Sequence, residues 1–135
     1  MIKGIAHTAY NVKDLEKSIA FYSDVLGFKK LFTMRHDDGK IMLVYMKVNE
    51  NQFIELFPAR SEQGENNQQG SYAHLCLEVE DINEIASEMK EKGIKLDVEP
   101  KQGKDGNYQC WIKDPDGNRI EFMQMMPDSL QNINK

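Results

Sequence analysis

The sequence of 135 residues has few cysteines, no excess of basic residues and no long hydrophobic run. Its two cysteines stand far apart without a CxxC spacing, which argues against a disulfide framework or a thiolate metal cluster. The net charge of −5 argues against a sequence-independent nucleic-acid binder, because phosphate binding needs clustered Lys and Arg. No apolar window is long enough for a signal peptide, or for the roughly 18 residues of a membrane span. We therefore expect a cytoplasmic protein that contacts neither nucleic acid nor membrane.

The main feature of the chain is an internal repeat. Hydrophobic residues make up 40% and charged residues 29% of the sequence, as in ordinary globular domains. Four landmarks recur half a chain apart at almost the same offset, namely a histidine, a helix-starting acid, a helix-ending glycine and a strand glutamate: His7 and His74, Asp14 and Asp81, Gly27 and Gly93, Glu55 and Glu121. Their common offset indicates that one module is written twice.

The first module is predicted to have the order β-α-β-β-β. Alternating side chains indicate a strand over residues 2–12, with His7 on the face opposite Tyr10 and Val12. Asp14 is expected to cap a helix that runs to the glycine at position 27. Three strands joined by turn sequences are predicted after it, over residues 29–35, 41–48 and 52–57.

The same order of elements is predicted for the second module. Residues 58–71 carry almost no apolar side chains and read as a linker. The elements expected after it are a strand over 72–79, a helix from Asp81 to Gly93, and strands over 94–99, 108–113 and 119–125. The expected organisation is thus an α+β protein whose modules, residues 1–57 and 72–127, form a curved mixed sheet, with a polar, frayed tail at 128–135.

Two glutamates lie in the middle of apolar strands, where a carboxylate is costly to bury unless a cation or hydrogen bonds receive it. Glu55 and Glu121 occupy equivalent positions in the repeat, as do His7 and His74. Each side chain alone could be structural or exposed, but the repetition favours one shared cation. Imidazole and carboxylate suit divalent Zn, Ni, Co, Mn or Fe, and a site without sulfur is typical of catalytic metal centres.

Two further residues receive separate interpretations. His36 lies in a charged turn and has no counterpart in the second module, so we expect it to be exposed to solvent. Cys76 lies two residues from His74 on the same strand face. It could line the site, but a small packed thiol is the favoured interpretation.

Two motifs resemble the vicinal oxygen chelate superfamily. They are I-x-H-x-x-x-x-V-x-D-L-x-x-S-x-x-F-Y-x-x-V-L-G-F at residues 5–28 and D-P-D-G-N-x-I-E-F at residues 114–122. Within the superfamily the chain is most similar to short bacterial glyoxalase I, also called lactoylglutathione lyase. The resemblance implies the glyoxalase/bleomycin resistance/dioxygenase-like fold and a homodimer in which the halves of a site come from one chain or from two. It also implies one divalent metal ion, Ni, Zn or Co, bound by His7, Glu55, His74 and Glu121.

The activity implied by the resemblance is proton transfer next to a carbonyl through a metal-bound enediolate. Glu121 would act as the base, with Glu55 able to take part as the second carboxylate. The leading candidate substrate is the hemithioacetal of methylglyoxal and a thiol. Alternatives are another metalloenzyme of the superfamily, either an epimerase or a fosfomycin-type thiol or water transferase, and a non-enzymatic small-molecule-binding protein.

The substrate contacts are expected to differ from those of glyoxalase I. That family grips the carboxylates of glutathione with an Arg four residues after the first His and an Asn four residues after the first Glu, where this chain has Asn11 and Ala59. The candidate substrate-binding residues are Asn11, Arg60, Phe53, Lys101 and Lys104. The candidates for the pocket wall are Phe53, Phe57, Tyr10, Trp111 and Met123, although each of the aromatics taken singly is expected to belong to the core.

Overall fold

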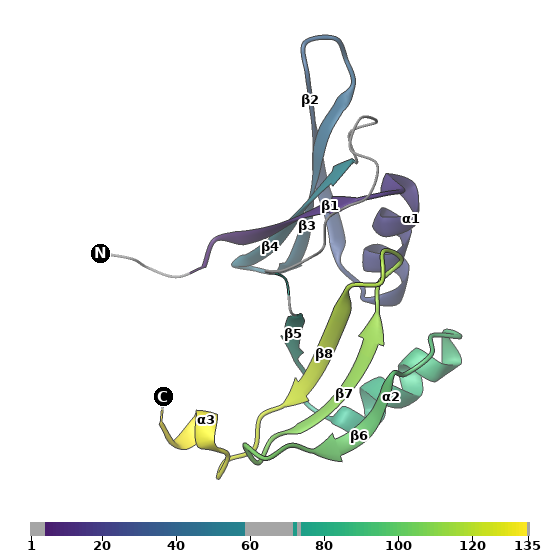
Figure 1. Ribbon diagram of the computed structural model, residues 1–135. Helices are drawn as coiled ribbons and strands as arrows, with labels where there is room; N and C mark the ends of the chain where they lie inside the picture. Colours follow the sequence, from purple (N-terminus) through teal and green to yellow (C-terminus); the bar gives the residue numbers. More distant parts are fainter. Residues whose placement is uncertain (1–4, 59–71, 73, 135) are drawn as a thin grey trace. The chain divides into compact units, whose positions relative to one another are not determined.

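The computed structural model describes residues 5–58, 72 and 74–134, and the chain divides into two units, residues 1–67 and 68–135 (Figure 1). Each unit contains one four-stranded mixed sheet. In both sheets the first strand runs parallel to the last, and the remaining neighbours are antiparallel. The α+β fold of two β-α-β-β-β modules predicted from the sequence is therefore confirmed.

The N-terminal unit contains four strands and a short helical segment that changes type halfway. Its elements are β1 (His7–Val12), α1 (Leu15–Ala20), η1 (Phe21–Val25), β2 (Lys29–Arg35), β3 (Ile41–Asn49) and β4 (Gln52–Pro58). The strand order in the sheet is β1-β4-β3-β2. Of the predicted linker at 58–71, Pro58 ends β4 and the other residues lie outside the described part of the chain.

The helix of the N-terminal unit begins as predicted and then widens into a π-helical turn. The Asp14 carboxylate accepts a hydrogen bond from the backbone N–H of Lys17 (3.0 Å), which satisfies one of the free donors of the first turn. In η1 the backbone N–H of Leu26 reaches back five residues to the carbonyl of Phe21. Phe21 and Tyr22 are both buried, so the wider turn accompanies the packing of two consecutive aromatic side chains.

Strand alternation gives the N-terminal sheet one packed face and one open face. The packed face carries side chains that are at most 2% exposed, namely Val44, Met46, Ile54 and Leu56. Tyr10 belongs to this face, where it stacks on Tyr22 of η1 at 6.5 Å between ring centroids. Tyr10 is therefore no pocket-wall residue but a core residue, as is expected of each aromatic candidate taken singly, because the strand turns its ring into the core. His7 points to the open face, as expected.

The C-terminal unit repeats this plan and adds a short helix. Its elements are β5 (Leu75–Glu78), α2 (Ile82–Glu91), β6 (Val98–Gln102), β7 (Tyr108–Lys113), β8 (Arg119–Gln124) and α3 (Leu130–Ile133). The strand order is β5-β8-β7-β6, and α2 packs along one face of the sheet (Figure 1). Asp81 caps α2 by accepting hydrogen bonds from the backbone N–H groups of Asn83 and Glu84, as its sequence motif predicts. Among the described residues no helix is long and apolar enough to cross a membrane.

Two segments of the C-terminal unit differ from the sequence prediction. The strand expected over 94–99 begins only at Val98, because the backbone N–H of Ile94 still bonds to the carbonyl of Met89 in α2. The tail, expected to fray, contains α3, whose first turn is capped by the buried hydroxyl of Ser129. The backbone N–H of Leu130 also bonds to the carbonyl of Asp105 (2.8 Å), so a loop distant in sequence holds this segment.

The turn that leads into β8 is built around one buried carboxylate. Asp114 is 5% exposed and accepts hydrogen bonds from the backbone N–H groups of Asp116 (2.9 Å) and Asn118 (2.8 Å). Its second oxygen accepts from the Asn118 side chain (2.9 Å). This turn sets the start of the strand that carries Glu121.

We expect Asp114→Ala to lower the free energy of unfolding by about 2–3 kcal/mol, because it leaves several turn donors without their acceptor. The matched control is Asp38→Ala in the exposed turn between β2 and β3, where the carboxylate accepts one backbone bond from Lys40. That change should cost less than about 0.5–1 kcal/mol. Urea unfolding of both variants measures the difference, and equal losses would contradict the assigned role.

Candidate functional site

A histidine and a glutamate face each other on the open face of the N-terminal sheet. The parallel pairing of β1 with β4 places His7 opposite Phe53, so Glu55 lies two residues further along the neighbouring strand. His7 Nε2 and Glu55 Oε2 are 3.2 Å apart. The imidazole is 39% exposed and the carboxylate 12%, so the glutamate is largely shielded while one side of the ring remains open.

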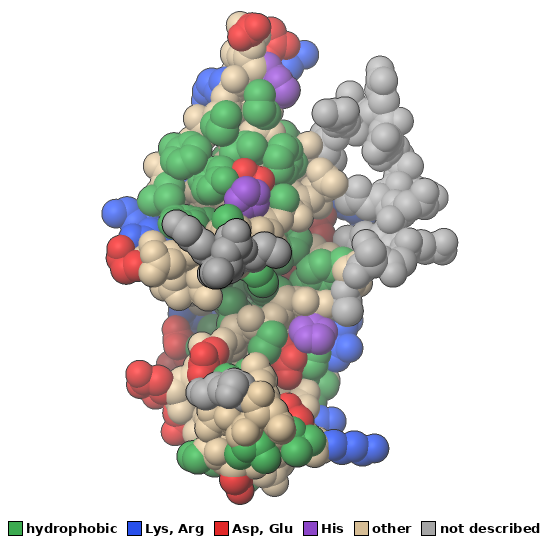
Figure 2. Space-filling model, turned by 90° about the vertical axis from the view of Figure 1, so that its left-hand side faces the viewer, with side chains coloured by type: hydrophobic (Ala, Val, Ile, Leu, Met, Phe, Trp, Pro, Cys, Tyr) green, Lys and Arg blue, Asp and Glu red, His purple; other side chains and the backbone are tan. Residues whose placement is uncertain are grey.

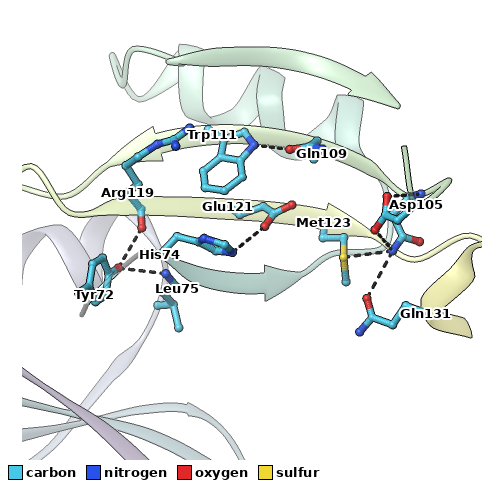
Figure 3. A network of polar contacts seen from close by, with 11 residues as sticks. Tyr72, His74, Leu75, Asp105, Gln109, Trp111, Arg119, Glu121, Met123 and Gln131 are labelled. Carbon is cyan, nitrogen blue, oxygen red and sulfur yellow. Dashed lines mark hydrogen bonds and ion pairs between the residues drawn. The ribbon is translucent and has the colours of Figure 1, made fainter. Parts of the chain in front are cut away.

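The C-terminal unit holds a second pair with nearly the same geometry. The parallel pairing of β5 with β8 places Cys76 opposite Glu121, which leaves Glu121 two residues further along than His74. His74 Nε2 and Glu121 Oε2 are 3.1 Å apart, with exposed fractions of 39% and 14% (Figure 3). The two His–Glu pairs are therefore equivalent in register, distance and exposure, as the repeat predicts.

An aromatic side chain lies beside each pair, at equivalent positions of the two sheets. Tyr45 of β3 is directly opposite Glu55, and Trp111 of β7 is directly opposite Glu121. Each ring meets its histidine edge to face, with centroid distances of 5.7 Å for Tyr45–His7 and 4.8 Å for Trp111–His74. The sequence predicts Trp111 only as a wall candidate and Tyr45 not at all, although the repeat offset that relates the glutamates also relates these two residues.

Tyr45 contributes a polar contact that Trp111 does not. Its hydroxyl lies 3.2 Å from His7 Nδ1, whereas the other ring nitrogen, Nε2, faces Glu55. A hydrogen bond to the Glu55 carboxylate is the main cause that raises the pKa of the Tyr45 phenol above its ordinary value, with burial and the carboxylate charge adding to it. The phenol therefore keeps its proton throughout the neutral range.

The open face of the N-terminal unit is apolar around its pair. Phe32 stacks on Tyr45 at 4.7 Å between centroids, and Phe53 lies at 6.4 Å on the other side of the same ring. Phe32 is 47% exposed and Met34 43%, which is unusual for large apolar side chains. Figure 2 shows hydrophobic side chains gathered over one face of this unit. Phe53 and Phe57, both wall candidates, share the strand face of Glu55.

The corresponding surface of the C-terminal unit is more polar. The guanidinium of Arg119 lies over the Trp111 ring, 4.2 Å from its centroid, and the indole N–H donates to Gln109 (Figure 3). Within the described residues no carboxylate lies in ion-pair distance of this guanidinium. Met123, another wall candidate, is buried on this side of β8 and its sulfur accepts from Asn107.

Cys76 is exposed rather than packed, which corrects the favoured sequence interpretation, and Cys110 is the buried thiol. The reason is that β5 turns Cys76 to the uncovered face of its sheet, whereas Cys110 faces α2. Partial desolvation by neighbouring atoms, followed by the nearby Glu121 carboxylate, raises the pKa of the Cys76 thiol to about 12. In the protein without metal the thiol therefore stays protonated at neutral pH.

The remaining candidates for substrate contact lie in different parts of the structure. Asn11 is exposed on the face of His7, and Lys101 of β6 lies opposite Gln109, on the sheet face of Glu121. Lys104 is exposed in the turn after β6. Arg60 and Ala59 lie outside the described residues. His36 is exposed in its turn, as predicted.

The side chains present fit half of a metal site in each unit. Each unit presents one imidazole nitrogen and one carboxylate oxygen that face each other, and no described Lys or Arg forms an ion pair with either glutamate. Throughout the described ranges no group of three or more His, Cys, Asp or Glu side chains comes together as a metal site. Within the described part of the chain each unit therefore presents two facing donor side chains, and imidazole nitrogen and carboxylate oxygen are donor types that suit a divalent ion of the Zn, Ni or Co type.

Comparison with known proteins identifies several relatives. The chain is 34% identical over 124 residues to the probable lactoylglutathione lyase of Synechocystis, covering 89% of this chain and 94% of that protein. The crystal structure of lactoylglutathione lyase from Agrobacterium tumefaciens superimposes with a TM-score of 0.70 at 25% identity, over 91% of this chain and 94% of the other. An antibiotic-binding protein from Streptomyces superimposes with a TM-score of 0.73 over 93% and 98% of the two chains, but at 22% identity this likeness shows the shared fold alone.

A match to a protein-family model leads to the same superfamily as these relatives. The model of the glyoxalase/bleomycin resistance protein/dioxygenase superfamily matches residues 4–122, which include both His–Glu pairs. The repeated topology and the equivalent pairs on the two open sheet faces are thus found within one matched region. The chain belongs to the glyoxalase/bleomycin resistance protein/dioxygenase superfamily.

Proposed function

We propose that the protein is a metal-dependent lyase or isomerase of the glyoxalase I type, with His7, Glu55, His74 and Glu121 as the ligands of one divalent ion. The observation that carries this proposal is the equivalence of the two His–Glu pairs, which share register, spacing and exposure. Relatives named lactoylglutathione lyase support the choice of reaction. Ni, Zn and Co all suit the four donor atoms.

The residues divide into two roles in this proposal. When bound, a divalent ion supplies Lewis-acid stabilisation for charge that develops on substrate oxygens. Glu121 removes the proton next to the carbonyl and returns it to the adjacent carbon, and Glu55 is the second carboxylate available for this transfer. Both carboxylates lie in apolar strands and are at most 14% exposed, so little water competes for the transferred proton.

The leading candidate substrate is the hemithioacetal of methylglyoxal and a thiol, which carries two neighbouring oxygens. Phe53 lines the open face beside His7, and Asn11 is exposed on the same face, so both are proposed substrate contacts. Lys101, Lys104 and Arg60 are proposed to meet an anionic part of the thiol. The first test is thioester formation from methylglyoxal and glutathione, followed by ultraviolet absorbance, with other thiols in parallel.

Removal of divalent metal should abolish this activity. Protein treated with a chelator and then freed of it is expected to lose activity by about two orders of magnitude or more, and to regain it when Ni, Co or Zn is added. Metal content measured in the same samples links activity to occupancy. Full turnover by metal-free protein would rule out the proposed chemistry.

Replacement of the proposed base should act mainly on turnover. Glu121→Gln is expected to lower kcat by about 10²- to 10⁴-fold, because the amide cannot accept the substrate proton. The matched control is Glu99→Gln, which alters a strand glutamate paired with Lys90 and should leave kcat unchanged. Measuring metal content of each variant separates loss of the base from loss of a ligand, and wild-type turnover by metal-loaded Glu121→Gln would refute the assignment.

Both His–Glu pairs should be needed for one site. His7→Ala and His74→Ala are each expected to weaken metal binding by more than the roughly 10- to 100-fold typical of a lost outer contact. We also propose a homodimer, which light scattering can test. In an equilibrated mixture of the two variants, recovery to about one quarter of wild-type activity would show that each site takes its pairs from different chains, since half of the dimers are hybrids with one intact site of two. No recovery would place both pairs on one chain.

The second candidate function is small-molecule binding without catalysis. The exposed aromatic surface of the N-terminal unit favours it, because Phe32 and Tyr45 form a stacked platform that could hold an apolar ligand. Other superfamily enzymes, such as an epimerase or a thiol or water transferase acting on an epoxide, would use the same ligands. Metal-loaded protein that exchanges no proton in α-hydroxycarbonyl compounds and opens no epoxide would favour the binding protein.

A further inference from the structure

The position of Tyr45 places its hydroxyl against both members of the N-terminal pair. The residue lies in the middle of β3, opposite Glu55, and its ring meets the His7 ring edge to face. The hydroxyl lies 3.2 Å from His7 Nδ1, while Nε2 of the same ring lies 3.2 Å from Glu55 Oε2. The imidazole is thus held on one side by the carboxylate and on the other by the phenol.

The packing around Tyr45 restricts where its hydroxyl can go. Phe32 stacks on one side of the ring, and Phe53 lies beside it on the neighbouring strand. An aromatic side chain that is held by two others loses little further freedom when its hydroxyl forms a hydrogen bond. The contact with His7 therefore costs little side-chain conformational entropy. His7 is less enclosed, because its side chain is 39% exposed at an edge strand of the sheet.

The C-terminal unit provides an internal comparison. Trp111 occupies the position of Tyr45 and packs against His74 in the same edge-to-face manner. Its only polar atom donates to Gln109 and does not reach the histidine. Packing of a ring against the histidine is therefore common to both units, whereas the hydrogen bond to the histidine from this position is particular to the N-terminal unit.

We infer that Tyr45 is a positioning residue that holds His7 with Nε2 turned toward Glu55 and so prepares this pair for a metal ion. The inference rests on the proposed metal site. A metal-binding histidine normally uses its second ring nitrogen in a hydrogen bond that fixes its tautomer and orientation. A hydroxyl that donates its proton to Glu55 can still accept a bond from the Nδ1–H of His7, so Tyr45 can partner the tautomer that leaves Nε2 free for a metal ion.

Metal affinity tests the inference without relying on activity. Tyr45→Phe keeps the ring and removes the hydroxyl, and it should weaken binding of Co or Zn, measured by competition with a chromophoric chelator, by about 10- to 100-fold. The control Tyr108→Phe removes the hydroxyl of an exposed tyrosine on β7 outside both pairs and should not change affinity. The thermal midpoints of the metal-free variants should match that of the wild type. Equal affinities of Tyr45→Phe and wild-type protein would overturn the inference.

Nitrogen chemical shifts of the imidazoles in metal-free protein provide a second measurement. Tyr45→Phe should change the Nδ1 and Nε2 shifts of His7 and leave those of His74 as they are, because only His7 loses a partner. Unchanged His7 shifts would show that the hydroxyl does not fix the ring. If the wild type binds no metal, the proposed function fails, and the imidazole shifts still decide whether Tyr45 positions His7.

Discussion

The parallel pairing of the first and last strand in each sheet is the constraint on which the site depends. It sets His7 and Glu55, and likewise His74 and Glu121, on neighbouring strands two residues apart and on one face. A slip by one residue would turn the glutamate into the apolar core and the neighbouring side chain out, so the buried face protects the register. The helices, caps and turns described above hold this pairing, which in turn sets the two distances of 3.2 Å and 3.1 Å.

The repeat keeps the pairs alike while the residues around them diverge. In the N-terminal unit the neighbours of the pair are Phe53 and the Tyr45 phenol, whereas the equivalent positions in the C-terminal unit are Arg119 and Trp111. The proposed metal site needs the same donors at both places, but a substrate with one apolar and one polar end needs different walls. Divergence of the walls around constant ligands is what an asymmetric small molecule would require.

Features that follow from the periodicity of the sequence are predicted correctly. Features that depend on contacts between residues distant in the chain are not. Strand parity places His7 and Tyr10 on different faces of the sheet and predicts the equivalence of the two pairs, and the same parity explains why Tyr10, a wall candidate, lies in the core. Cys76 was expected to be packed because parity cannot say which sheet face remains uncovered. The tail helix depends on the buried Asn107 and Ser129, and Asn107 bonds to the backbone of Met126, a contact that no local pattern reveals.

The proposed metal site has an energetic consequence that follows from the two-ligand content of each unit. Among the described residues each unit has one His–Glu pair, so in the proposed site the affinity for metal would include the free energy of bringing an N-terminal and a C-terminal unit together. By linkage, a bound ion strengthens that association by the same amount, and conditions that weaken one weaken the other. Rigid positioning within each pair then matters for metal affinity. If the His7 imidazole is already ordered in the metal-free protein, no conformational entropy of this side chain is lost when the ion binds. The Tyr45 ring packs against Phe32 and Phe53, and its hydroxyl orders His7 in the folded chain. We therefore expect this contact to contribute more to the free energy of metal binding than to the free energy of unfolding of the unit that contains it.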